Sequence, residues 1–212
     1  MDVIILAGGK GSRMEDPLPK ALVLAKNLPI IDHQLNYLFK DNQVNKIILA
    51  IGFKSDLIIN HINKSYPSKS IDFSIETQPL GTGGAIRKAL DLVDSSRVLI
   101  LNCDDITDID ISKLNQITGN VLCVAHPTLP FGIVNETESG KVVFQEKPKL
   151  DVWVSCGWYL LNNLDLRAQL KEISSIEYDF FPNVDLNLYK HEGLWYPLNS
   201  KKDIKEFENK LD

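Results

Sequence analysis

The sequence has few cysteines, no long apolar run and no excess of positive charge. Its 212 residues include only three cysteines (Cys103, Cys123 and Cys156), at no metal-binding spacing, so we expect reduced core side chains rather than disulfides. No stretch approaches the roughly 20 apolar residues of a membrane-spanning helix, and the first apolar run is too short for a signal peptide. The net charge of −5 argues against nucleic acid as the main partner. These absences predict a cytoplasmic chain that binds neither nucleic acid nor membrane.

Apolar runs of strand length alternate with helix-like patterns through the first half of the chain. The strand-like runs lie at residues 3–6, 47–51, 71–75 and 98–101, and the helical patterns lie at 29–38, 56–63 and 85–92. Such alternation is typical of right-handed crossovers between parallel strands. We therefore predict one α/β, Rossmann-like domain with a mixed, mainly parallel sheet, helices on both faces and ligands beyond the carboxyl ends of the strands.

The second half changes character, because short strand-like segments follow one another there without intervening helices. These segments lie at residues 121–125, 131–134, 142–145 and 153–161, and helical patterns follow at 163–173 and 203–211. We expect this half to extend the same sheet and to supply a lid or pocket for a second substrate.

The most informative stretch follows the first apolar run. It reads Leu6-Ala7-Gly8-Gly9-Lys10-Gly11-Ser12-Arg13, with Lys20 after a short gap. Glycines allow a sharp turn and present backbone N–H groups without a Cβ, which makes a cradle for anions. Arg13 and Lys20 add fixed positive charge to the same loop. This combination predicts a polyphosphate site.

Two common phosphate-binding patterns do not fit this loop. A Walker loop requires Lys-Ser or Lys-Thr directly after its last glycine, whereas Ser-Arg follows Gly11. A dinucleotide fingerprint requires a third glycine, where Met14 stands, and a helix, which Pro17 and Pro19 disfavour. The spelling instead resembles the signature loop of the sugar-1-phosphate nucleotidylyltransferases.

A second glycine-rich segment, residues 76–84, follows the third strand-like run and resembles the base-binding segment of that family. Its spelling is closest to the mannose- and heptose-1-phosphate guanylyltransferases. An ionised Glu76 would accept hydrogen bonds only, which suits the adjacent N1–H and N2–H donors of guanine and not the carbonyls of uracil. The alternative is that Glu76 ends a strand in solvent. The resemblance implies that the nucleotide is bound by Leu6, Ala7, Gly8, Gly9, Gly11, Ser12, Glu76, Gly81 and Thr82.

Carboxylates cluster after the fourth strand-like run, within residues 102–105. This segment resembles the family's Asn-Gly-Asp motif, whose aspartate binds Mg²⁺, which implies that Asp104 is a metal ligand while Asp105 belongs to the turn. The closing block, residues 195–204, places Asn199 where the family's second metal ligand is usually Asp. An Asn carbonyl oxygen can still bind Mg²⁺. The resemblance therefore implies a Mg²⁺ site at Asp104 and Asn199.

Three further blocks resemble the parts of the family that hold the sugar and its phosphate. They contain Gly132, Glu146, Lys147 and Ser155. The resemblance implies that Gly132 allows close approach of the sugar, that Glu146 accepts from its hydroxyls and that Lys147 pairs with the phosphate. Ser155 stands where Asn is usual, which leaves the identity of the sugar open at that point.

The resemblance covers about residues 2–211 and implies a single catalytic domain of the nucleotide-diphospho-sugar transferase fold, with a nucleotide half (1–110) and a sugar-phosphate half (111–212). The left-handed β-helix that many relatives append has no counterpart. The resemblance also implies Mg²⁺-dependent transfer of a nucleotidyl group from an NTP, with GTP favoured, to a sugar 1-phosphate. In this reaction Arg13 and Lys20 would be the catalytic cations. A CTP-, UTP- or dTTP-using enzyme and a catalytically weak regulatory homologue remain alternatives, and a homodimer is possible.

Overall fold

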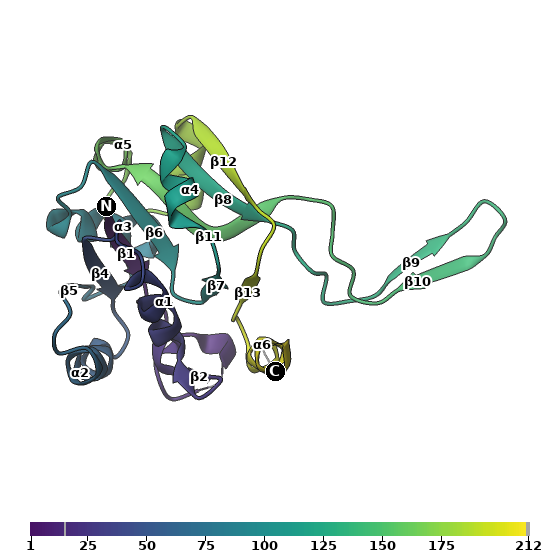
Figure 1. Ribbon diagram of the computed structural model, residues 1–212, viewed down its shortest axis with the longest axis horizontal. Helices are drawn as coiled ribbons and strands as arrows, with labels where there is room; N and C mark the ends of the chain where they lie inside the picture. The colour runs from purple at the N-terminus through teal and green to yellow at the C-terminus, as the bar shows by residue number, and fades with distance from the viewer. Residues whose placement is uncertain (15, 211–212) are drawn as a thin grey trace.

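A seven-stranded sheet forms the centre of the protein, in the order β12-β8-β11-β6-β1-β4-β5 (Figure 1). The computed structural model describes residues 1–14 and 16–210. All neighbouring pairs in the sheet are parallel except the two that involve β11. The predicted α/β class and the mainly parallel sheet are confirmed.

The parallel half is built from the alternating pattern of the first hundred residues. Its strands are β1 (Asp2–Leu6), β4 (Lys46–Ile51), β5 (Ile71–Ile75) and β6 (Arg97–Asn102), and its helices are α1 (Ile30–Leu38), α2 (Ser55–Ser65) and α3 (Gly81–Ala89). Strand β1 lies between β4 and β6, and along the strand order the chain continues from β4 to β5 at one edge and from β6 toward β8 in the opposite direction. The crevice beyond β1 and β6 is therefore a topological switch point, where ligands bind in open α/β sheets.

The second half extends this sheet, as expected from its strand-like segments. The added strands are β8 (Asn120–Ala125), β11 (Val154–Asn162) and the edge strand β12 (Leu186–His191). Strand β12 was not predicted, because its alternating polar residues carry no continuous apolar run. The helix expected over 163–173 is shorter, since α5 covers Asn163–Gln169 and Leu170 has an extended backbone.

Helices cover both faces of the sheet because its central strands are apolar on both sides. One buried cluster joins Ile5 to α1 and to α6 (Lys201–Lys210), and the other joins Ile4 to α3 and α5.

The three cysteines are buried and free, as predicted. No helix within the described residues is long and apolar enough to cross a membrane. The predicted helix at 203–211 is seen as α6, and residue 211 lies outside the described residues.

Short elements fill the connections between the main ones. They are the 3₁₀ turns η1 (Ser12–Met14), η2 (Lys20–Leu22), η3 (Leu90–Leu92) and η5 (Phe181–Asn183), the π-helical turn η4 (Ile176–Phe180), helix α4 (Ile111–Gln116), and the strand pairs β2 (Leu24–Ala25) with β3 (Leu28–Pro29) and β7 (Asp105–Thr107) with β13 (Trp195–Pro197). Asp105 therefore starts a strand, which corrects the expectation that it belongs to the turn.

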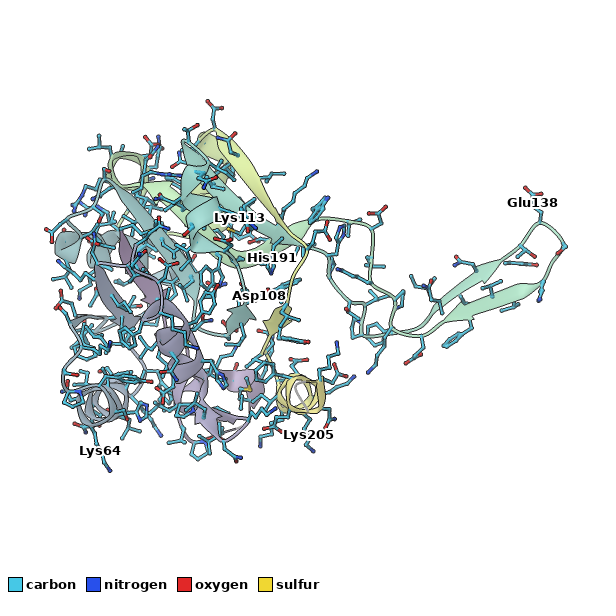
Figure 2. The ribbon with its side chains drawn as sticks, in the orientation of Figure 1. Lys64, Asp108, Lys113, Glu138, His191 and Lys205 are labelled. Atoms are coloured by element: carbon cyan, nitrogen blue, oxygen red, sulfur yellow. The ribbon has the colours of Figure 1, made fainter. Side chains whose placement is uncertain are left out.

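One segment leaves the body of the molecule altogether. Strands β9 (Ile133–Glu136) and β10 (Val142–Gln145) form a hairpin that projects far to one side, and we call residues 127–152 the arm (Figure 1). Figure 2 shows the side chains of the hairpin standing free of the body, with Glu138 at the tip, whereas Lys147 nearer the root pairs with Glu206 of α6 (2.7 Å). Backbone hydrogen bonds from Leu129 N to Pro148 O (2.9 Å) and from Leu150 N to Pro127 O (2.9 Å) pair the two chains at its root.

Candidate active site

Two adjoining cavities open at the carboxyl ends of β1 and β6. The larger has a volume of about 610 Å³ and the smaller about 350 Å³. Leu6, Gly9 and Asp104 line both, so the two cavities are neighbouring compartments of one site. Residues that the sequence predicted for the site therefore line the crevice at the switch point.

The glycine-rich loop forms the wall between the compartments. Gly11 has a φ of +62°, and a Cβ there would lie 2.7 Å from the Cβ of Lys20. A Cβ at Gly8 would lie 2.9 Å from Oε1 of Glu76. The left-handed backbone favours glycine at Gly11, and the absence of a side chain at Gly8 leaves room for the Glu76 carboxylate. Ala7 and Ser12 line the smaller compartment with this loop.

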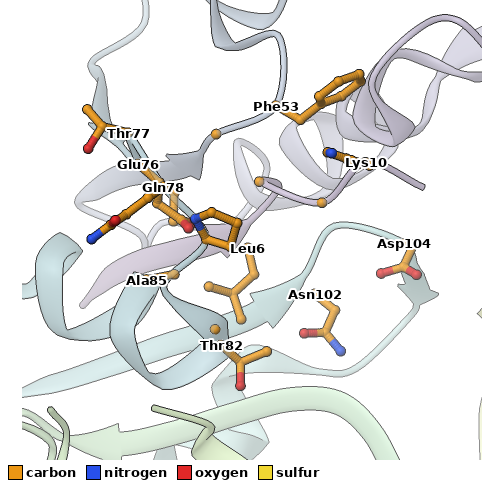
Figure 3. A pocket seen from close by; sticks show the side chains of 16 residues that line it. Leu6, Lys10, Phe53, Glu76, Thr77, Gln78, Thr82, Ala85, Asn102 and Asp104 are labelled. Carbon is orange, nitrogen blue, oxygen red and sulfur yellow. The ribbon is translucent and has the colours of Figure 1, made fainter. Parts of the chain in front are cut away.

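Glu76 projects into the larger compartment, directly after β5 (Figure 3). Its amide donates to Ile51 O (2.8 Å), and its Oε2 accepts from Leu80 N (3.2 Å). Burial raises the pKa of this carboxyl above its usual value. One oxygen is thus fixed by the backbone while the side chain borders the cavity, where Gly81 and Thr82 also lie.

Two backbone amides in the first turn of α3 already have a protein partner. Gly83 N and Gly84 N donate to Ser174 O at 2.9 and 3.2 Å, and the Thr82 hydroxyl donates to Glu177 (2.8 Å). These two amides are therefore not available to an anion.

The smaller compartment gathers the charged residues. Arg13, Lys20, Asp104 and Asn199 line it together. The Lys20 ammonium contacts the Asp104 carboxylate and lies 3.2 Å from Oδ1 of Asn199. Leu198 N donates to Asp104 O (2.8 Å), which joins the segment after β13 to the end of β6. The structure thus brings together two catalytic candidates and two metal-ligand candidates from distant parts of the chain.

Asp104 and Asn199 fit a divalent cation of the Mg²⁺ type. Both offer oxygen atoms, which Mg²⁺ prefers, and both turn them toward one positive group, the Lys20 ammonium. Within residues 1–14 and 16–210, no three His, Cys, Asp or Glu side chains group as a metal site. Mg²⁺ commonly uses one or two protein ligands and fills the rest with water and substrate phosphate oxygens.

Asp105, the neighbour of Asp104 in the chain, is buried. Trp195 Nε1 donates to its Oδ1 (2.9 Å) and Asn102 Nδ2 to its Oδ2 (3.0 Å). Burial and the neighbouring Asp104 charge raise the pKa of Asp105 to about 7.

The four sugar-block residues lie outside both compartments. Gly132, Glu146 and Lys147 belong to the arm, where the Lys147 ammonium pairs with Glu206 of α6 (2.7 Å). Ser155 is exposed on β11, and its hydroxyl lies 3.4 Å from that of Tyr159. The structure does not bring these residues to the nucleotide compartments, and their roles stay predictions.

Sequence reasoning missed several lining residues of the larger compartment. Figure 3 shows Lys10 beside Phe53, and Gln78 beside Glu76, with Asn102 across the cavity. The Lys10 ammonium lies 5.8 Å from the centre of the Phe53 ring, within cation–π range. Phe53 follows β4 as Glu76 follows β5, so its position just after a parallel strand is the signal that could have found it.

Comparison with known proteins gives a consistent result. The family model described as nucleotidyl transferase matches residues 2–184. A D-glycero-alpha-D-manno-heptose 1-phosphate guanylyltransferase of Aneurinibacillus thermoaerophilus is 31% identical over 192 residues, covering 85% of this chain and 83% of the relative. The protein of the same name from Campylobacter jejuni is 34% identical over 170 residues, with 76% of each chain covered. A probable mannose-1-phosphate guanylyltransferase 1 of Oryza sativa is 35% identical over 228 residues, covering 96% of this chain and 62% of the relative.

Solved structures share the fold. HddC from Yersinia pseudotuberculosis, complexed with GMP-PN, matches with a TM-score of 0.81 at 24% identity and covers 100% of this chain and 99% of that one. A UDP-glucose pyrophosphorylase complexed with UDP-glucose matches with a TM-score of 0.74 at 16% identity, covering 99% and 97%. The predicted nucleotide-diphospho-sugar transferase architecture is thereby confirmed.

Proposed function

Because the chain belongs to the nucleotidyl transferase family, we propose that it transfers GMP from GTP to a sugar 1-phosphate, forming a GDP-sugar and pyrophosphate. Two relatives that align over three quarters or more of the chain are named heptose-1-phosphate guanylyltransferases, which supports guanine and a heptose 1-phosphate. The observation that carries the proposal is the Glu76 carboxylate bordering the larger compartment beside the glycine-rich loop.

Guanine is the base that best matches Glu76. Its Watson–Crick edge offers two adjacent donors, N1–H and N2–H, to an ionised carboxylate that can only accept. Uracil and thymine present carbonyl oxygens at the corresponding positions, which the carboxylate would repel. Leu6 and Ala85 supply apolar surface for the faces of the base and the ribose in the same compartment.

Phosphate binding follows from the loop and the two cations. The backbone amides between Gly8 and Ser12 and the Arg13 guanidinium would hold the β- and γ-phosphates and the departing pyrophosphate. Lys20, which lines the smaller compartment, would bridge the α-phosphate and the sugar phosphate. The sugar phosphate oxygen attacks the α-phosphorus in line and the bond to the pyrophosphate oxygen breaks, so no protein nucleophile is needed.

A bound Mg²⁺ at Asp104 and Asn199 would neutralise phosphate charge during this transfer. This metal site is supported by the side-chain oxygens of Asp104 and Asn199, which both lie next to the Lys20 ammonium. The residues of the chain do the rest by holding the triphosphate and the sugar phosphate in line within one crevice.

The sugar end of the site is assigned from the sequence motifs. Gly132, Glu146, Lys147 and Ser155 would bind the sugar and its phosphate, as their motif positions suggest, although they lie outside the two compartments. A cytoplasmic location is supported by the three free, buried cysteines. A homodimer is supported by the apolar side chains that the arm leaves exposed.

Magnesium-dependent release of pyrophosphate tests the proposal. The purified chain is assayed with GTP, UTP, dTTP and CTP, each against the 1-phosphates of heptose, mannose, glucose and N-acetylglucosamine. We expect release with GTP and heptose or mannose 1-phosphate. Binding of the nucleotide sugar without turnover would favour the regulatory homologue, which Asn199 in place of Asp motivates. Turnover with a pyrimidine triphosphate would overturn the assignment of GTP.

A further inference from the structure

The hairpin of the arm is exposed to solvent along its length. Strands β9 and β10 pair in register with each other and, within residues 1–14 and 16–210, with no third strand. Every residue from 134 to 147 is exposed. A two-stranded hairpin on its own is at best marginally stable in water, and packing against another element stabilises it. The arm therefore has the features of a segment that another surface covers in the working protein.

Apolar side chains gather on one face of this hairpin. The strand register places Val134 opposite Phe144 and Glu136 opposite Val142. Directly opposite residues share a face, and so do residues two apart along a strand. Val134, Val142 and Phe144 therefore lie on the same face, where they are 63%, 62% and 62% exposed. Side chains of this size together present roughly 300 Å² of apolar surface, and exposed patches of that size are often functional.

The same face carries two of the residues that the sequence motifs assign to the sugar. Gly132 lies two positions before Val134, and Glu146 lies two positions after Phe144. A Cβ on Gly132 would collide with the Phe144 ring and would lie 3.2 Å from Oε2 of Glu146. The ring and the carboxylate therefore meet over Gly132. We call the face formed by Gly132, Val134, Val142, Phe144 and Glu146 the apolar face of the arm.

Contacts at the root hold the direction of the arm. His126 Nδ1 lies 2.9 Å from Leu150 O and 3.0 Å from Val152 O, which ties the returning chain to the end of β8. The Lys147 ammonium pairs with Glu206 of α6 (2.7 Å). Swinging the arm back over the compartments of its own chain would break these contacts. The arm thus projects outward and offers its apolar face to another molecule (Figure 1).

A second copy of this chain is the partner that fits this arrangement. Neither compartment is lined by an arm residue among those that the structure describes, so each chain has a nucleotide site without its sugar-binding residues. Each chain also has an arm that presents such residues away from its own body. A two-fold pair satisfies both chains at once, because the same two surfaces then meet twice. Two apolar faces and the surfaces that they cover would bury about 1,200 Å², which reaches the size of a specific interface.

We propose that the chain works as a dimer in which the arm of each copy completes the site of the other. Phe144 and the two valines of the apolar face anchor the arm on the second copy, and Gly132 and Glu146 border the sugar bound there. This inference rests on the proposed function, since it names the source of the residues that bind the sugar. The dimer and the exchange of arms can each be measured.

Sedimentation equilibrium tests the assembly and the face that it uses. We expect the wild type to be a dimer at about 10 μM. Phe144→Ser should raise the dimer Kd by roughly 30-fold or more, because it removes the central aromatic anchor. Val143→Ser is the matched control, since Val143 is 45% exposed on the opposite face of the same strand. Its dimer Kd should stay within about threefold of wild type.

Mixed dimers test whether the arm acts on the other copy. Glu146→Ala and Arg13→Ala chains are expressed together with different tags, and dimers that carry both tags are isolated. Pyrophosphate release is measured at a sugar 1-phosphate concentration below KM. The Glu146→Ala dimer should be roughly 10- to 100-fold less active than wild type, and the Arg13→Ala dimer at least as impaired. In the mixed dimer one site combines an intact loop with an intact arm, so about half of the wild-type activity should return.

A second mixed dimer is the control for this recovery. Arg13 and Asp104 line the same compartment of one chain. A mixed dimer of Arg13→Ala and Asp104→Asn therefore has one defect in each nucleotide site, and it should stay as inactive as its parents.

Three results would overturn the inference. They are a monomeric wild type at about 100 μM, equal weakening of the dimer by Phe144→Ser and Val143→Ser, or a mixed dimer of Glu146→Ala and Arg13→Ala no more active than the Glu146→Ala dimer. If the wild type releases pyrophosphate while that mixed dimer shows no recovery, this inference fails and the proposed function stands. No release by the wild type with any nucleotide would remove the proposed function, and this inference with it.

Discussion

Sequence motifs predicted site residues both after the parallel strands and on the arm, yet the structure brings only the first set together. The first set converges: the glycine-rich loop after β1, Glu76 after β5 and Asp104 after β6 line two joined compartments. The second set, Gly132, Glu146 and Lys147, stands on a hairpin that projects away from the body (Figure 1). Similar motif evidence thus predicts spatial grouping well in one region and leaves it undecided in the other.

Strand register explains the difference. Leu6 at the end of β1 pairs with Ala50 of β4 and with Asn102 of β6, so the residues just beyond these strands must meet. The arm has no such constraint, because β9 and β10 pair only with each other. A motif at the end of a central parallel strand therefore fixes its neighbours, while a motif on an isolated hairpin does not.

Among the residues that line the two compartments, loss of the metal ligand Asp104 should have the largest effect on turnover. We expect Asp104→Asn to lower Mg²⁺-dependent turnover by about 10³-fold, since a metal ion contributes several kcal/mol to stabilising phosphoryl charge. Pyrophosphate release at saturating Mg²⁺ measures this. Asp108→Asn, an acidic residue four positions away on the far side of β7, is the control and should retain most of the activity. Equal activity of Asp104→Asn and wild type would remove Asp104 from the metal site.

Arg13→Ala should lower kcat/KM by roughly two to three orders of magnitude, because the guanidinium is assigned to the phosphates that gain charge in the transition state. Its thermal unfolding should match wild type, since Arg13 is exposed on a ligand loop. Arg87→Ala is the matched control, because Arg87 pairs only loosely with Asp91 on the surface of α3 (3.7 Å). A near wild-type kcat/KM for Arg13→Ala would contradict the assignment of Arg13 to the phosphates.

Lys147→Ala tests whether the arm takes part in catalysis at all. Loss of one charged hydrogen bond to the sugar phosphate predicts an increase of about tenfold in the KM for sugar 1-phosphate. The Kd for GTP should change by less than about twofold, because Lys147 lies outside the nucleotide compartment. Lys141→Ala near the tip of the arm is the control. An unchanged KM would show that the arm contributes no contact to the sugar phosphate.

A substitution in the central sheet should lower the free energy of unfolding far more than a substitution on the arm. Ile100 is completely buried in β6, and Ile100→Ala should cost roughly 2–5 kcal/mol of the free energy of unfolding. Phe144 is 62% exposed on the arm, and Phe144→Ser should cost less than about 0.5 kcal/mol. Chemical denaturation at low protein concentration measures both. A large cost for Phe144→Ser would mean that the arm is covered in solution, as a homodimer would require.

The sequence predicts most of the fold for a physical reason. Buried parallel strands need continuous apolar runs, and three such runs became β1, β4 and β6, while the alternating run at 71–75 became the edge strand β5. The edge strand β12 and the short pair β7–β13 escaped prediction, because polar or aromatic residues alternate in them and tertiary contacts stabilise them. Helix α3 starts at Gly81 rather than at residue 85, because Ser174 caps its glycine-rich first turn from the other half of the chain.

The candidate site was predictable where motif residues sit at strand ends, and not where contacts depend on chain segments far apart. Asn199 reaches Lys20 only because β13 pairs with β7, a contact that no local pattern encodes. Asp105 looked like a turn residue from its neighbours, and its burial depends on Trp195, which lies ninety residues later. Long-range hydrogen bonds of this kind have no sequence period.

Glu76, directly after β5, is assigned the selection of guanine, and this selection is measured by the ratio of kcat/KM for GTP to that for UTP. The ratio is measured for wild type and for Glu76→Gln with the same sugar 1-phosphate. Two hydrogen bonds to a charged group are lost, each worth roughly 1.5–3 kcal/mol, so GTP efficiency should fall on the order of a hundredfold or more. The glutamine can donate to a pyrimidine carbonyl, so the ratio should shift toward UTP. A ratio that stays within about twofold of wild type, or a wild-type preference for UTP, would contradict the claim.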